Sequence, residues 1–246
     1  MINYIKAELY RSFNRVSFWA YIAFIGILAI LANVMIFKGM PTEIINFYDF
    51  VMTIIGMPIF LVVSFVDIIT AEENKNETLR NVVVFGVSRS KIILSKLVAT
   101  VILAFIAEII ILVLFFGSAF ILVGVNNELI STIISFCKKS LVATPLWIAS
   151  IAIGTCLAVI IKNNTIFAFV YAGIFLLTDK IIMALSFFVS DKFKYLGNIL
   201  ITKKINEIST SSLTSETIIS SVLMGVIYTL VFTTITILYF EKKEVK

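Results

Sequence analysis

The stretch LVATVILAFIAEIIILVLFFGSAFILVGV, residues 97–125, decides the fold because it is almost entirely apolar. A helix needs about 20 apolar residues to cross the hydrocarbon layer of a bilayer. This stretch is longer than that, so it predicts a transmembrane helix that tilts or projects beyond the bilayer. Its one ionisable side chain, Glu108, lies near the middle.

The rest of the chain has the same character on both sides of this stretch. Hydrophobic residues make up 60% and charged residues 14% of the 246 residues, and the mean hydropathy is +1.08. This composition excludes a water-soluble globular domain. We predict an all-α membrane protein with six transmembrane helices in a single domain, residues 1–246. The predicted helices cover residues 16–37, 50–70, 97–125, 141–161, 166–179 and 218–240.

Two of these helices contain an irregularity. Pro58 lies inside the second helix, where it removes a backbone donor and predicts a kink. In the fifth helix, Asp179 and Lys180 interrupt the apolar run. One interpretation is a single long helix with a charged pair near its end. We favour the other, in which the helix ends near Asp179 and a shallow re-entrant helix follows within an extracellular segment, residues 180–216.

Residues 1–15 have a different pattern. Ile2, Ile5, Leu9 and Phe13 recur at helical spacing, and Lys6, Glu8 and Arg11 fall elsewhere around the helix. This predicts an N-terminal amphipathic helix in the membrane interface, with a solvated tail as the alternative.

The basic residues indicate the orientation. Twelve of the twenty lysines and arginines, including all four arginines, fall in residues 1–15, 71–96, 162–165 and 241–246. Because basic segments stay on the cytoplasmic side, we expect both termini in the cytoplasm. Contacts with anionic lipid headgroups account for the net charge of +5, and we expect no nucleic-acid partner.

The sequence contains few of the side chains that commonly carry out catalysis or bind metals. It contains no histidine, and Cys137 and Cys156 match no metal-ligand or redox spacing. No stretch matches the phosphate-binding pattern G-x-x-x-x-G-K-[ST], so the chain is not expected to bind ATP. We therefore predict a protein that is not an enzyme and that has no metal or other cofactor.

The polar segment 71–96 resembles the loop between helices two and three of ABC-2 type permeases, which reads approximately E-x-x-x-G-T-L-x-x-x-x-x-x-x-x-S-R-x-x-I-x-x-G-K. The matching residues are Glu73, Thr78, Leu79, Ser88, Arg89, Ile92 and Lys96. Glu77 and Ser95 stand where the family usually has glycine. The layout of the whole chain is also similar to that family.

The resemblance implies the ABC-2 type exporter fold and one transmembrane half of an ATP-binding-cassette transporter in a bacterial plasma membrane. The partners it implies are a separate cassette ATPase, in two copies, and a second permease half, either a copy of this chain or a relative. Segment 71–96 would be the cytoplasmic coupling loop. Its candidate contacts with the ATPase are Glu72, Glu73, Arg80, Ser88 and Arg89. The small size resembles bacitracin and lantibiotic immunity and peptide-export permeases, which implies export or removal of an amphipathic peptide.

Three polar residues inside predicted helices are candidates for a substrate path: Glu108, Asn33 and Tyr171. A carboxylate inside a membrane is costly, so Glu108 belongs to a substrate or proton path, or forms an interhelical hydrogen bond. The alternative function is a stand-alone secondary transporter or channel, although residues 1–125 and 126–246 show no convincing repeat. A membrane enzyme is a third alternative, for which we find no acid–base or metal constellation.

Overall fold

The computed structural model describes residues 1–39, 47–71 and 88–242. Within them every regular element is a helix, and six helical segments are long and apolar enough to cross a membrane. These segments are α2 (Val16–Val34) with η1 (Met35–Gly39), α3 (Phe47–Ile54) with α4 (Pro58–Val66) and η2 (Asp67–Ala71), α7 (Arg89–Val123), α8 (Asn127–Ile160), α9 (Asn164–Phe188) and α11 (Ser215–Lys242). Three shorter elements are α1 (Ile2–Phe13), η3 (Asp191–Ile199) and α10 (Ile201–Thr210). The all-helical class is confirmed.

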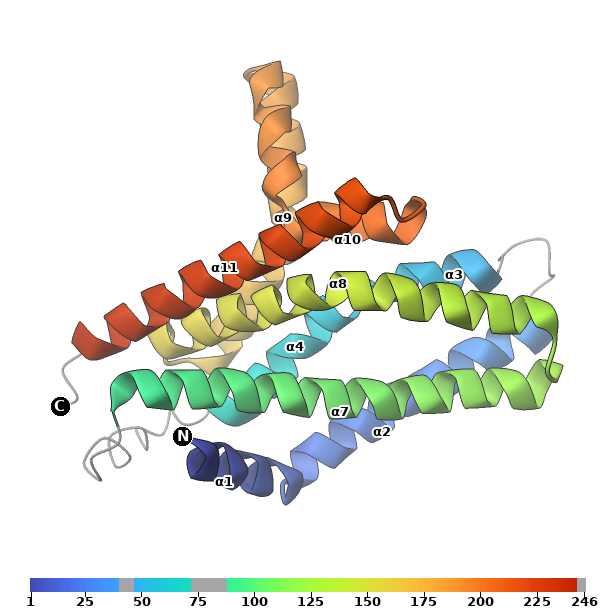
Figure 1. Ribbon diagram of the computed structural model, residues 1–246, viewed down its shortest axis with the longest axis horizontal. Coiled ribbons are helices and arrows are strands. Elements are labelled where there is room, and N and C mark those ends of the chain that lie inside the picture. The colour runs from blue at the N-terminus through green and yellow to red at the C-terminus, as the bar shows by residue number, and fades with distance from the viewer. Residues whose placement is uncertain (40–46, 72–87, 243–246) are drawn as a thin grey trace.

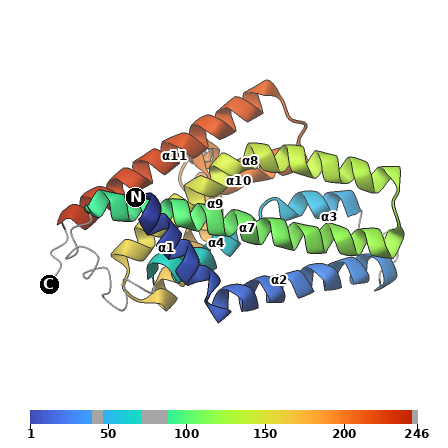
Figure 2. The same ribbon diagram turned by 60° about the horizontal axis from the view of Figure 1, so that its bottom comes forward.

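Figure 1 shows α7 and α8 side by side along the long axis of the molecule, with α2 against α7 and α11 against α8. Figure 2 shows the same packing from another side, with α1 lying across the start of α7. The helices α7 and α8 have 35 and 34 residues. At 1.5 Å per residue each is about 50 Å long, which exceeds the ~30 Å hydrocarbon layer.

The central helix is α8, which is more buried than any other spanning segment. We predicted its start at residue 141, but it begins at Asn127. The difference has a local cause, because the side chain of Asn126 accepts a hydrogen bond from the Leu129 amide (2.7 Å) and caps the helix. Further along, the ammonium of buried Lys139 donates to the Ser209 carbonyl at 2.6 Å. Polar residues before residue 141, which we expected to lie in a loop, therefore belong to a helix and form hydrogen bonds there.

The most extensive helix–helix contact joins α8 and α11. At its centre Gly225 faces Pro145, and a Cβ atom on Gly225 would lie 2.5 Å from Pro145. Only glycine allows the backbones to approach so closely, as is common between membrane helices.

The kink predicted at Pro58 is a complete break between α3 and α4. Proline leaves the Ile54 carbonyl without its usual helical partner, and the Met57 amide donates to it instead at 2.8 Å. Side chains of other helices then donate to carbonyls near the break: Ser209 to Met52 (2.7 Å), Trp147 to Ile55 (3.2 Å) and Tyr171 to Ile59 (2.9 Å). The break is thus stabilised by α8, α9 and α10.

The preferred interpretation of helix five was wrong, because α9 continues through Asp179 and Lys180 to Phe188. Neither glycine nor proline occurs at this point, and both charged side chains line a pocket. The helix therefore does not have to end at Asp179 to accommodate the charged pair. The second half of α9 and η3 together stand away from the other helices (Figure 1). Residues 180–216 thus contain the end of α9, η3 and α10 rather than one re-entrant helix.

The short helix α1 packs on α7, and its buried side chains are Glu8 and Ser12. The apolar residues Ile5, Leu9 and Phe13 are half-buried against the cluster around Phe18. Its polar side therefore faces protein, while the predicted location in the membrane interface stays a prediction.

Candidate functional site

The end of the bundle where α1 lies also contains Ala71, the first residues of α7 and the last residues of α11, and we call it the terminal end (Figure 1). Lys96 of α7 is fully buried there. Its ammonium donates to Glu8 Oε1 at 2.9 Å and to the Ile69 carbonyl at 2.7 Å. One side chain thus joins α7 to both α1 and η2.

Arg11 completes this cluster. Its Nη2 atom lies 2.6 Å from Glu8 Oε2 and 3.4 Å from the Ile69 carbonyl oxygen. Glu8 therefore accepts from two cations, one at each carboxylate oxygen. A buried charge is tolerated only when it is paired and hydrogen-bonded, and Lys96 and Glu8 meet this condition together.

The charged groups of this cluster change the pKa values of the side chains around Glu8. The pKa of the Tyr4 hydroxyl is raised, first by burial and then by the Glu8 carboxylate, and Lys96 lies 6.0 Å from the Tyr4 ring. Burial and the nearby positive charge of Arg11 lower the pKa of Arg15. Positive charge therefore exceeds negative charge around Glu8, which makes removal of its carboxylate costly.

Arg89, one of the predicted coupling residues, forms a second connection at the terminal end. Its Nη1 atom donates to the carbonyls of Phe240 (2.9 Å) and Glu241 (2.6 Å), and its guanidinium lies 5.8 Å from the centre of the Phe240 ring. A cation at a helix C-terminus pairs with carbonyls that have no partner in the helix. Arg89 thus ties the start of α7 to the end of α11.

The other predicted coupling residues divide between described and undescribed parts of the chain. Ser88 is exposed and precedes α7, and its carbonyl accepts from the Ile92 amide at 3.1 Å. Glu72, Glu73 and Arg80 lie outside the described residues. The structure therefore describes what flanks residues 72–87, and the coupling role of all five stays a prediction.

The three candidate substrate-path residues form separate contacts. Asn33 is buried and its Nδ2 donates to the Phe115 carbonyl (2.6 Å) and to Ser118 (2.8 Å), which joins α2 to α7. Tyr171 is buried at the α4–α9 contact through its hydrogen bond to Ile59. Neither of them lines a described pocket that also contains Glu108.

Glu108 lies between α4, α7 and α8. It lines a small, almost wholly apolar pocket of about 40 Å³ with Pro58, Phe65 and Trp147. Within the described residues its carboxylate has no hydrogen-bond partner, so the interhelical hydrogen bond that we considered is not present in this part of the chain. Its role in a substrate path stays a prediction.

Sequence reasoning placed Glu8 only on the polar side of the N-terminal helix and did not assign a role to Lys96 beyond its place in the loop pattern. The two residues are 88 positions apart, and no periodicity connects them. The available signal was a lysine followed directly by a long apolar stretch, which requires a partner if the helix is buried there.

A comparison with family models finds no match, and a comparison with curated proteins finds no significant similarity.

Proposed function

We propose that this chain is the membrane-spanning permease subunit of an ATP-binding-cassette transporter of the ABC-2 type. In this proposal it lies in a bacterial plasma membrane with both termini in the cytoplasm, and a separate ATPase, in two copies, drives it. It pairs with a second permease half, which is a copy of this chain or a relative. The substrate is a hydrophobic or amphipathic molecule such as an antimicrobial peptide.

The observation that supports this proposal most is the anchoring of both flanks of residues 72–87. On one flank, the Ile69 carbonyl is bonded to Lys96 of α7. On the other, Arg89 is bonded to the end of α11. A displacement of this segment by a partner would therefore be passed to helices on both sides of it, as a coupling element requires.

The sequence also agrees with a transporter in which this chain spans the membrane and a separate chain hydrolyses ATP. The described residues contain six apolar spans and the sequence has no phosphate-binding loop, so in this proposal the energy comes from the separate ATPase. The polar residues that match the permease pattern lie in and beside segment 71–96, the only long internal polar segment on the side that we expect to be cytoplasmic.

The test is co-purification with a cassette ATPase encoded beside this chain, followed by measurement of ATPase activity in the complex. Glu73→Ala combined with Arg89→Ala should weaken assembly and lower the activity of the complex. Lys192→Ala combined with Lys194→Ala is the control, since both lysines lie on exposed η3. Unchanged assembly and activity in the first variant would contradict the coupling role, and transport by the purified chain without ATP would favour a stand-alone transporter.

A further inference from the structure

A pocket of about 460 Å³ lies where α9 diverges from the helices around it. Its floor consists of apolar side chains of α4, α9 and α10, among them Phe60, Phe175 and Ile205. The broken helix contributes Gly56 and Met57. Its polar side chains include Asp179, Lys180, Lys203 and Asn206. The pocket is therefore amphipathic, with hydrocarbon and charge in one cavity.

A second pocket, of about 470 Å³, adjoins the first and is bounded by η3, α10 and α11. It is mostly polar, and Lys203 lines both pockets. A molecule placed across Lys203 would meet an apolar surface on one side and hydroxyl, amide and charged groups on the other. Such a pair of adjoining cavities fits a molecule with a polar head and an apolar chain.

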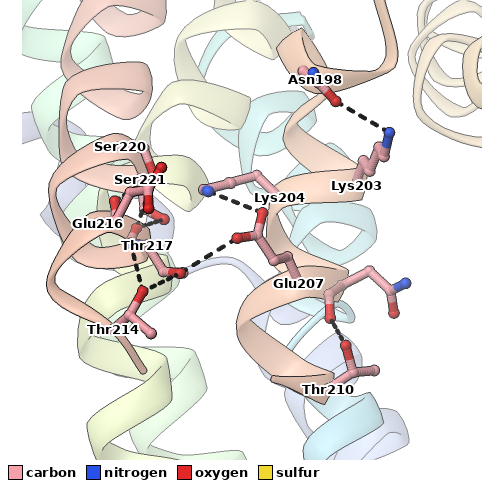
Figure 3. A network of polar contacts seen from close by, with 11 residues as sticks. Asn198, Lys203, Lys204, Glu207, Thr210, Thr214, Glu216, Thr217, Ser220 and Ser221 are labelled. Atoms are coloured by element: carbon pink, nitrogen blue, oxygen red, sulfur yellow. Dashed lines mark hydrogen bonds and ion pairs between the residues drawn. The ribbon is translucent and has the colours of Figure 1, made fainter. Parts of the chain in front are cut away.

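The adjacent lysines of α10 have different partners. Lys204 forms an ion pair with Glu207 at 2.9 Å, and Glu207 also accepts from Thr217 of α11 at 3.3 Å. Figure 3 shows Lys204 directed toward Glu207, while Lys203 is directed away from them toward Asn198. The bond from Lys203 to the Asn198 amide oxygen is 3.2 Å long and leaves its charge without a carboxylate partner in the described residues. Lys204 is thus structural, and Lys203 is available to a ligand.

Lys180 is the second cation of the first pocket. It is exposed on α9 and forms no ion pair within residues 1–39, 47–71 and 88–242. Three carboxylates border the cavities: Asp179 in the first, and Glu207 and Glu216 in the second. Glu207 is paired with Lys204, whereas Asp179 and Glu216 have no ion-pair partner in the same residues. Two lysines attract an anion, and these carboxylates disfavour a head with a second negative charge.

The geometry points to a binding site for a singly charged anionic amphiphile, with the anionic group at Lys203 and Lys180 and the hydrocarbon chain against Phe60 and Phe175. The anion donates no proton and accepts from the ammonium groups, and Asn206 can donate its amide to the same head. Binding requires neither ATP nor a second subunit, so it can be measured apart from the proposed transport function.

The experiment is photolabelling of the full chain, purified in a neutral maltoside detergent, with a fatty acid that carries a diazirine on its chain. We expect labelled peptides from the start of α4 and the middle of α9. Lys180→Ala combined with Lys203→Ala should lower the labelling at least about tenfold, because the loss of even one charged hydrogen bond has an effect of that size. The control is Lys192→Ala combined with Lys194→Ala, which removes the same charge from η3 outside both pockets.

Competition distinguishes the two parts of the ligand. Palmitate should displace the probe, whereas acetate, which has the head alone, and monopalmitoylglycerol, which has the chain and a neutral head, should not. Displacement by acetate would overturn the role of the apolar floor, and displacement by monopalmitoylglycerol would overturn the role of the lysines. Labelling spread evenly over all the apolar helices, or unchanged in the Lys180/Lys203 variant, would overturn the site itself.

Discussion

Lys96 and Glu8 form a buried ion pair of 2.9 Å across 88 positions of sequence. The same ammonium also binds the Ile69 carbonyl. This arrangement holds the N-terminal helix, the end of the second span and the start of α7 in one place.

The first prediction concerns this pair. Glu8→Ala should destabilise the fold by about 3–5 kcal/mol, because it removes the carboxylate that pairs with buried Lys96. Lys96→Ala should cost less, because Glu8 keeps its ion pair with Arg11. Glu8→Leu combined with Lys96→Met should recover part of the loss of Glu8→Ala, since the buried ammonium is then also removed, while Arg11 still loses its contact with Glu8. Thermal unfolding in detergent measures the effect, and Lys91→Ala, on the exposed side of the same helix, serves as control. Additive losses in the double variant would contradict the coupling of the two residues.

Gly225 provides a test of the α8–α11 contact. Gly225→Ala should cost about 1–3 kcal/mol, because the new Cβ atom would meet backbone and side-chain atoms of Pro145. Gly173→Ala is the matched control, since a Cβ atom there meets nothing within 4 Å. In that variant the higher helix propensity of alanine should leave stability unchanged or slightly higher. Equal thermal stability of the two variants would argue against the close packing.

Lys139 of the central helix α8 joins α10 through a hydrogen bond. Lys139→Met should lose about 2 kcal/mol of local stability, because it removes the charged donor to the Ser209 carbonyl. The measurement is hydrogen exchange of the amides of residues 201–210, which should become faster. Lys138→Met changes the neighbouring exposed lysine and should leave the exchange rates as they are. Slow exchange in both variants would show that α10 is held by its apolar side alone.

A substitution of Glu108 should have opposite effects on stability and on transport. Glu108→Leu should raise thermal stability, by about 2–3 kcal/mol, because it removes a carboxyl group from an apolar pocket that offers it no hydrogen bond in the described residues. If Glu108 also belongs to the substrate path, export by the assembled transporter should fall in the same variant. Glu128→Leu, at the exposed start of α8, is the control. Lower stability in Glu108→Leu would show that the carboxyl group has a structural partner.

The amino-acid sequence was sufficient to predict an all-helical membrane protein with six spans, which the described residues confirm. Runs such as residues 97–125 cannot be exposed to water, and a helix satisfies its own backbone in lipid, so length and hydropathy suffice to identify these segments. The same local reasoning failed for residues 127–140 and for Asp179 with Lys180. Polar residues look like helix ends when their partners are unknown, and those partners lie on other helices or at a pocket.

Which polar side chains meet depends on the packing of the helices, and the sequence did not predict it. Lys96 with Glu8, Arg89 with the end of α11, and the two pockets joined by Lys203 all depend on how the helices pack. A sequence pattern shows only which residues share one face of a single helix. The contacts between faces far apart in the chain arise from packing, and no local pattern contains them.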